Sequence, residues 1–139
     1  MHLTVAGHDT YVYTGGRALV PGQPSILFVH GAAHDHSVWA LQSRYFAYHG
    51  SNVLAVDLPG HGRSAGAPLP SVEAIADWLV ALLDAAEVPA AAVVGHSMGS
   101  LASLEFAARA AGRVRKVALL GPSVPMPVSE ALLDAARRD

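Results

Sequence analysis

The chain has 139 residues, of which 52% are hydrophobic and 14% are charged, and its formal net charge at pH 7 is −2. This length fits one folded domain, and the hydrophobic content suits a sheet that is buried on both faces. The balanced charge excludes a strongly basic nucleic-acid-binding protein, and the absence of cysteine excludes disulfides and thiolate metal sites.

Membrane and export signals are also missing from the sequence. No apolar stretch approaches the roughly 18–20 residues of a membrane span. The first residues lack the basic and apolar regions of a signal peptide. We therefore expect a cytoplasmic protein with neither a membrane nor a nucleic-acid partner.

Short apolar runs alternate with segments of helical periodicity along the chain. Residues 3–5 and 10–13 are predicted to form an antiparallel hairpin around Gly7, His8 and Asp9. Buried strands are predicted at 26–29, 53–56, 91–94 and 117–120. Helices are predicted at 38–48, after the capping residue Ser71, at 98–110 and at 129–138.

The repeated strand–helix–strand units predict an α/β fold. We expect a mostly parallel sheet of about six strands, joined by right-handed crossovers and covered by helices on both faces. Residues 1–128 are predicted to form the core, and residues 129–139 a terminal helix. The proline-rich stretch at 122–127 is the candidate boundary.

The segment Gly95-His96-Ser97-Met98-Gly99 matches the pattern G-x-S-x-G where a predicted strand meets a predicted helix. A sharp turn here lifts the Ser97 hydroxyl above the sheet, and two residues without a Cβ let strand and helix pass closely. The backbone N–H of Met98 then points toward a bound carbonyl oxygen. The alternative is a chance match or an ordinary helix start, but the placement favours a nucleophile.

A second element of the predicted site follows the first buried strand, in His30-Gly31-Ala32-Ala33. A small residue there, Ala32, can supply the second oxyanion N–H. The alternative is a plain turn at the strand end, and the serine turn favours the functional interpretation. We interpret His30 as structural, holding loop backbone through hydrogen bonds.

The loop Asp57-Leu58-Pro59-Gly60-His61-Gly62-Arg63-Ser64 follows the second buried strand. Its glycines and proline predict a tight loop in which Asp57 accepts backbone N–H groups. A catalytic role for Asp57 is disfavoured, because its loop precedes the nucleophile. The chain order on folds with this serine turn is Ser, Asp, His.

Metal and cofactor sites are not supported by the sequence. The tripeptide His34-Asp35-His36 suggests a metal, but zinc needs three or four ligands and no further cluster completes the set. His96 is interpreted as packing around the serine turn, because adjacent side chains diverge there. No glycine cluster matches a phosphate loop or a dinucleotide fingerprint.

These three segments, in this order, resemble the N-terminal part of an α/β-hydrolase-fold serine hydrolase. The resemblance implies that Ser97 is the nucleophile and that Met98 and Ala32 are the oxyanion donors. The structural motif positions are His30, Gly31, Asp57, Gly60, His61, Gly62, Gly95, His96 and Gly99. The resemblance further implies that Ser97 forms an acyl-enzyme with a small ester, lactone or related carbonyl compound, and that the reaction uses no cofactor. Serine at the turn argues against the dehalogenase and epoxide hydrolase branches, which use a carboxylate.

The sequence departs from that family after Ser97. Family members carry about eight strands, with the acid and histidine of the triad beyond the sixth. No histidine follows Ser97, and the acids that follow are Glu105, Glu130, Asp134 and Asp139. None of them is placed to orient a base, and the terminal helix resembles the start of a lid.

Two hypotheses follow for the chain as given. In the first, the chain is a truncated or split hydrolase, which is impaired by itself and is completed by a second polypeptide or by a longer reading frame. Alternatively, it is complete and serves as a non-catalytic binding or dimerisation module. In either case the last strand, Val117-Ala118-Leu119-Leu120, is expected at the sheet edge, where it can pair with a complementing chain or a second copy.

Overall fold

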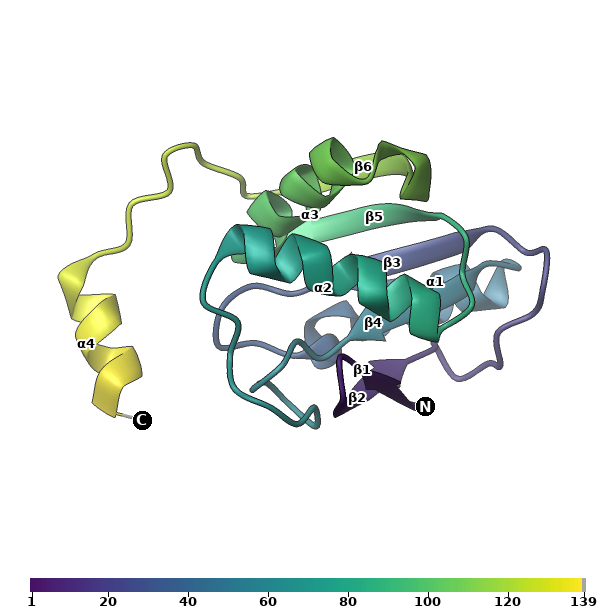
Figure 1. The fold of residues 1–139 in the computed structure, drawn as a ribbon, viewed down its shortest axis with the longest axis horizontal. Coiled ribbons are helices and arrows are strands. Elements are labelled where there is room, and N and C mark those ends of the chain that lie inside the picture. The colour runs from purple at the N-terminus through teal and green to yellow at the C-terminus, as the bar shows by residue number, and fades with distance from the viewer. Residues whose placement is uncertain (139) are drawn as a thin grey trace.

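Continuous apolar runs form the centre of the sheet. The computed structural model describes residues 1–138, in which six strands are ordered β1-β2-β4-β3-β5-β6 (Figure 1). The strands are β1 (His2–Val5), β2 (His8–Tyr13), β3 (Ser25–Val29), β4 (Asn52–Val56), β5 (Ala91–His96) and β6 (Val114–Leu120). Pairing is antiparallel for β1–β2 and β2–β4 and parallel for the other three pairs. The predicted fold class is therefore confirmed.

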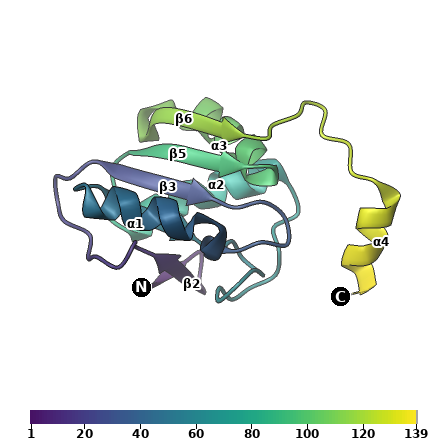
Figure 2. The same cartoon turned by 180° about the vertical axis from the view of Figure 1, so that it is seen from behind.

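The helices lie on both faces of this sheet. A short 3₁₀ turn (His36–Trp39) leads into α1 (Ala40–Tyr48) on one face, whereas α2 (Val72–Ala85) and α3 (Met98–Arg109) lie on the other (Figure 2). A second 3₁₀ turn (Ala111–Arg113) precedes β6, and α4 (Glu130–Arg138) ends the described chain. The Ser71 side chain caps α2 by accepting a hydrogen bond from Ala74 N at 3.1 Å.

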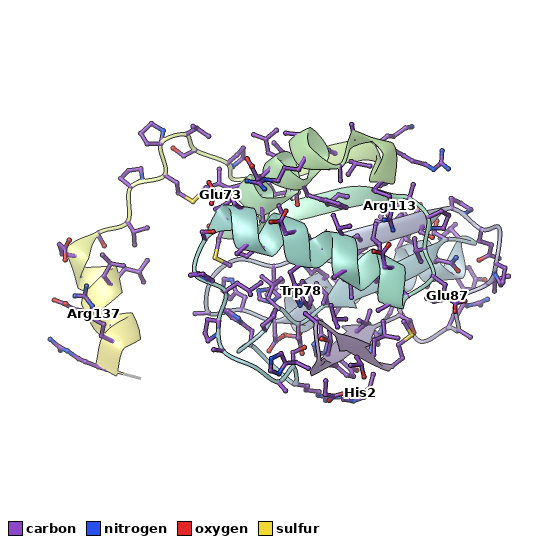
Figure 3. The ribbon with its side chains drawn as sticks, viewed as in Figure 1. His2, Glu73, Trp78, Glu87, Arg113 and Arg137 are labelled. Carbon is purple, nitrogen blue, oxygen red and sulfur yellow. The ribbon has the colours of Figure 1, made fainter. Side chains whose placement is uncertain are left out.

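Two apolar clusters fill the space between sheet and helices. The larger lies beneath α2 and α3 and includes Leu79 and Phe106, both fully buried. Figure 3 shows Trp78 of α2 directed into the body of the molecule, whereas Arg137 of α4 lies apart from it. The smaller cluster lies beneath α1, where the rings of Phe28 and Trp39 are 5.1 Å apart. Packing on both faces therefore fixes the central strands.

Residues 121–129 carry α4 away from the sheet, as both ribbon views show. The side chain of Leu132 is 61% exposed, so the helix has little apolar contact with the rest of the molecule. The division at residue 128 and the lid-like role of the helix remain predictions. Within the described residues, no helix has the length and apolar character needed to cross a bilayer.

Several predicted details differ from the structure. The hairpin turns at Ala6 and Gly7, both with positive φ, so β2 begins at His8. The prediction that residues 117–120 form a buried strand is wrong, because β6 is the last strand of the described sheet. Val117 and Leu120 are exposed by 38% and 43%. The expectation that this strand lies at the sheet edge agrees with the strand order of the described residues, so the error concerns its burial alone.

Candidate nucleophile turn and its surroundings

Ser97 joins β5 to α3 with a backbone that L-residues rarely adopt. Its φ is 53° and its ψ is −120°, although it carries a side chain. Hydrogen bonds hold it on both sides: Ser97 N donates to Leu120 O at 2.9 Å, and Ser97 O accepts from Ser100 N at 2.8 Å. Strain of this kind persists where the surrounding structure over-determines it, which is typical of functional sites.

The two glycines of the motif allow β5, β3 and α3 to approach closely. A Cβ on Gly95 would overlap the Gly99 carbonyl and the Ser103 hydroxyl. A Cβ on Gly99 would overlap the carbonyl groups of Val29 and His30. Only glycine therefore fits at these positions without moving backbone.

The Ser97 hydroxyl is half-buried at the carboxyl end of β5. Its recorded partner among residues 1–138 is the thioether of Met126, with Oγ and Sδ 4.0 Å apart. No hydrogen bond to a histidine or carboxylate is recorded for this hydroxyl within the described residues. No sequence pattern predicts that Met126 lies here, since 29 residues separate the two positions.

The loop after β3 lies against the serine turn. A Cβ on Gly31 would come within 3.2 Å of Ser97 Cβ and 3.3 Å of His96 Nδ1. His34 N donates to Gly31 O at 3.3 Å, closing a turn in which Ala33 has a φ of 58°. Ala32 lies inside this turn, and Met98 begins α3, where the first N–H groups have no partner within the helix. Both candidate donor segments thus border Ser97.

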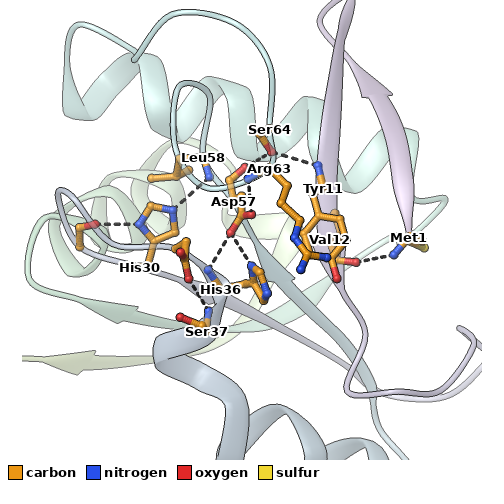
Figure 4. Close-up of polar contacts among 12 residues, drawn as sticks. Met1, Tyr11, Val12, His30, His36, Ser37, Asp57, Leu58, Arg63 and Ser64 are labelled. Atoms are coloured by element: carbon orange, nitrogen blue, oxygen red, sulfur yellow. Dashed lines mark hydrogen bonds and ion pairs between the residues drawn. The ribbon is translucent and has the colours of Figure 1, made fainter.

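His30 holds two loops together (Figure 4). Its Nδ1 lies 2.7 Å from Gly31 O, and its Nε2 accepts a hydrogen bond from Leu58 N at 3.1 Å. Both ring nitrogens are therefore engaged, with the proton on Nδ1. Burial lowers the pKa of His30 below its usual value, and the nearby His61 ring lowers that pKa further, against the Gly31 hydrogen bond, which raises it.

Because the His30 ring is buried, we expect the free energy of unfolding to depend on pH. The pKa of His30 is about 6.5 in the unfolded chain and lower in the folded one. As pH falls below about 6.5, the unfolded chain gains a proton that the folded state does not, so the free energy of unfolding falls until the folded pKa is passed. Urea titrations from pH 7.5 to about 5 should show this decline, and it should be smaller in His30→Gln. An equal decline in both proteins would contradict the assignment, and exposed His8→Gln is the control.

Asp57 is the centre of the second network and is fully buried. Its carboxylate accepts hydrogen bonds from His36 N at 2.7 Å, His36 Nδ1 at 2.8 Å and Arg63 N at 2.9 Å (Figure 4). Ser64 Oγ donates to Asp57 O at 2.6 Å and accepts from Tyr11 N at 2.9 Å. Asp57 thus joins the loops after β3 and β4 and links them to β2.

The tight loop around Asp57 depends on its glycines. Gly62 has a φ of 54°, and a Cβ there would overlap the Asp57 carboxylate. A Cβ on Gly60 would overlap the ring of Pro68. His61 lies between these glycines, with Nδ1 3.0 Å from Pro59 O and its ring 5.1 Å from that of His30.

A possible metal cluster is accounted for by the same network. Ligand atoms of Asp35, His36 and Asp57 lie within 4.8 Å of one another. Both Asp57 oxygens accept N–H bonds, however, and Asp35 Oδ1 accepts from Ser37 N at 2.8 Å to cap the 3₁₀ turn. These groups hold the loop that carries Ala32, and a cation would have to displace their bonds.

A cavity of about 590 Å³ lies at the opposite end of the sheet. It is lined by residues at the start of β3 and β4, including Ser25 and Asn52, whereas Ser97 follows the end of β5. The Asn52 amide already bonds Val20 N at 2.8 Å and Val20 O at 2.9 Å. This cavity offers no unpaired buried polar group, and the chemistry of the motif lies elsewhere.

Comparison with known proteins decides the family. A family model described as "alpha/beta hydrolase fold" matches residues 24–139. The chain belongs to this family. The serine turn, the loop after β3 and the Asp57 loop of this α/β hydrolase all lie within the matched residues.

Two curated relatives and one solved structure illustrate the match. The chain is 38% identical over 107 residues to the dihydrolipoyllysine-residue acetyltransferase component of the acetoin cleaving system of Cupriavidus necator, covering 73% of this chain and 27% of that protein. It is 30% identical over 100 residues to (E)-2-((N-methylformamido)methylene)succinate hydrolase of Acinetobacter baylyi, covering 71% of this chain and 37% of that protein. The enol-lactonase of Burkholderia xenovorans superposes with a TM-score of 0.75 at 28% identity, covering 84% and 45% of the two chains. This α/β hydrolase thus spans less than half the length of each.

Proposed function

We propose that this α/β hydrolase chain carries the nucleophile and oxyanion hole of a serine hydrolase that acts on a small ester, lactone or related carbonyl compound. The observation that carries the proposal is the backbone of Ser97, with a φ of 53° between β5 and α3. Nothing in an ordinary helix start requires that conformation. An enol-lactonase and a succinate-derivative hydrolase among the similar proteins support the substrate class.

The chemistry follows from where the groups lie. Ser97 Oγ attacks the substrate carbonyl carbon while its proton passes to a base, and a tetrahedral oxyanion forms. The N–H groups of Met98 and Ala32 donate to that oxyanion, and the positive end of α3 adds to the stabilisation. Collapse expels the alcohol or enol, which takes up the proton, and leaves an acyl-Ser97 ester. Water then hydrolyses this ester to the acid and restores the hydroxyl.

The described residues do not bring a base to Ser97. Both nitrogens of His30 are engaged by Gly31 and Leu58, and His61 Nδ1 contacts Pro59 O. We therefore propose that the acid and base of the full reaction come from polypeptide beyond these residues, either in a longer frame or in a complementing chain. The chain by itself should show weak turnover, because oxyanion stabilisation alone leaves serine proteases about 10³–10⁴-fold above water.

Hydrolysis of p-nitrophenyl acetate by the chain, by Ser97→Ala and by Ser51→Ala tests this proposal. We expect slow release of p-nitrophenol that Ser97→Ala lowers to the residual rate which oxyanion donors sustain without a nucleophile. Ser51 precedes β4 at the far end of the sheet, so its replacement should change nothing. Intact-mass detection of a fluorophosphonate adduct gives a second readout, and the adduct should be absent from Ser97→Ala.

Two results would overturn parts of the proposal. Turnover and labelling unchanged by Ser97→Ala would remove the nucleophile assignment. Rapid turnover that is abolished by Ser97→Ala would show that a base within this chain is working, and His61→Gln would then identify or exclude that ring.

A further inference from the structure

Two histidine rings border the serine turn. His34 lies in the loop after β3, and His96 is the last residue of β5, directly before Ser97. The two ring centroids are 6.0 Å apart, with an angle of 39° between the planes. A Cβ on Gly31 would stand 3.2 Å from Ser97 Cβ and 3.3 Å from His96 Nδ1, so the serine and this imidazole border the same point. A ligand bonded to Ser97 would therefore lie beside both rings.

These two rings differ from most histidine rings of the chain. Hydrogen bonds recorded within residues 1–138 engage a ring nitrogen of five histidines, namely His2, His30, His36, His49 and His61. No such bond is recorded in the same residues for the rings of His34 and His96, which contact each other. The imidazole N–H groups beside Ser97 are therefore the ones that remain for a ligand.

The surroundings of the pair suit a negatively charged group. Asp35 and Asp57 lie in the neighbouring loops, but their carboxylates already accept N–H bonds, from Ser37 N at 2.8 Å and from His36 N at 2.7 Å. Helix α3 begins at Met98, and its N-terminal end carries a partial positive charge. An imidazole donates one N–H bond when neutral and two when protonated. An acceptor between the rings would thus meet donors and no competing carboxylate from these two loops.

We propose that His34 and His96 bind a carboxylate of the substrate while its reacting carbonyl lies between Ser97 and the oxyanion donors. This inference rests on the proposed function and narrows the substrate class to esters or lactones that carry a carboxylate. Each ring donates an N–H bond to one carboxylate oxygen, at the distance of about 2.7–2.9 Å typical of charge-assisted bonds. The rings position the substrate and take no part in proton transfer.

A carboxylate suits the pair better than a phosphate. No lysine or arginine occurs in residues 30–37 or 91–103, which carry the two rings and the serine turn. Arg63 in the Asp57 loop lies over the Tyr11 ring instead, with Cζ 4.8 Å from the ring centroid. Phosphate sites in proteins commonly use arginine or lysine, whereas two single donors match the two oxygens and one charge of a carboxylate.

Residues close to the two rings fix their positions. The parallel pairing of β3 with β5 sets Val29 beside Gly95, so the segments that follow these strands leave the sheet side by side. Polypeptide that completed the hydrolase over this end would enclose both rings together with Ser97. Enclosure of that kind is what small-molecule sites use to bury a ligand. The two rings would therefore border the substrate in the chain by itself and in a completed enzyme.

Ligand titrations followed by the imidazole C–H resonances test the pair directly. Ser97→Ala prevents turnover and keeps both rings, and monomethyl succinate differs from dimethyl succinate by one carboxylate. We expect monomethyl succinate to shift the resonances of His34 and His96 and to bind at least tenfold more tightly than the diester. The His8 ring is the internal control. It begins β2, three strand positions from β5 or about 14 Å, and should not shift.

Activated esters show on which side of the scissile bond the carboxylate lies. Mono-p-nitrophenyl adipate carries it on the acyl group, and its methyl ester is the neutral counterpart. A second pair, 3-carboxy-4-nitrophenyl acetate and p-nitrophenyl acetate, carries it on the leaving group or lacks it. We expect one anionic ester to acylate Ser97 about tenfold faster than its counterpart. His34→Leu should remove this preference, whereas His8→Leu should retain it.

Each outcome bears on one assignment. Unshifted His34 and His96 resonances, equal binding of the neutral diester, or tighter binding of inorganic phosphate would overturn the carboxylate site. A preference for the anionic ester that survives His34→Leu would do the same. Fluorophosphonate labelling of Ser97 without any preference would overturn this inference and leave the nucleophile in place. Absent labelling with intact ligand shifts would overturn the nucleophile alone.

Discussion

Asp57→Ala is expected to lower the free energy of unfolding by about 3–5 kcal/mol. The substitution removes the acceptor of three hydrogen bonds, from His36 N, His36 Nδ1 and Arg63 N, at a site with no solvent exposure. Each buried donor left without a partner costs about 1–3 kcal/mol. Single domains are stable by about 5–15 kcal/mol, so a substantial part of the total would be lost.

Urea unfolding at pH 7 measures this effect, and two variants act as controls. Asp57→Asn retains one acceptor oxygen and nearly the same shape, so it should lose less than Asp57→Ala. Asp77→Asn removes an exposed partner of Arg109, and its effect should stay within about 0.5 kcal/mol. Equal stability of Asp57→Ala and Asp77→Asn would show that the network contributes nothing. The loss should also loosen the loop that carries Ala32, because His36 anchors it.

The sequence predicted the elements whose residues are covered on both faces. Runs such as 26–29 and 53–56 are apolar throughout, and this pattern has one stable solution, a buried strand. The same pattern at 117–120 was misleading, because the burial of a strand depends on what lies beside it. The helix expected at 38–48 begins as a 3₁₀ turn from His36, where Asp35 caps it through Ser37 N. Local pattern thus predicts an element better than it predicts its neighbours.

The candidate site also has parts that could be predicted from the sequence and parts that could not. The turn at Ser97 was predictable, because the glycines and the serine are contiguous and their conformation is local. The bond from His36 to Asp57 and the contact from Met126 to Ser97 were not, since 21 and 29 residues separate the partners. Their sequence signal is weak: the tripeptide His34-Asp35-His36 suggests a metal site that the rest of the sequence does not support, and nothing in it points to Asp57. The structure instead joins His36 to the carboxylate that organises both loops.

Gly99→Ala is expected to cost about 3 kcal/mol of stability, at the upper end of overpacking effects. The added Cβ would lie 2.5 Å from His30 O and nearer still to Val29 O, and both contacts are backbone. Backbone of a central strand cannot rotate away as a side chain can, so α3 must move off β3. Ser97 and Met98 stand at the start of α3 and would move with it. The serine turn would therefore separate from the loop that carries Ala32.

Gly112→Ala is the matched control for Gly99→Ala, because a Cβ on Gly112 meets nothing within 4 Å and the φ of Gly112 is not positive. Its effect on the free energy of unfolding should stay within about 0.5 kcal/mol. Thermal and urea unfolding of both variants measure the difference, and fluorophosphonate labelling of Ser97 should slow only in Gly99→Ala. A Gly99→Ala protein as stable as Gly112→Ala would mean that β3 and α3 can separate freely. In that case the close approach of the two elements could not be what aligns the serine with its oxyanion donors.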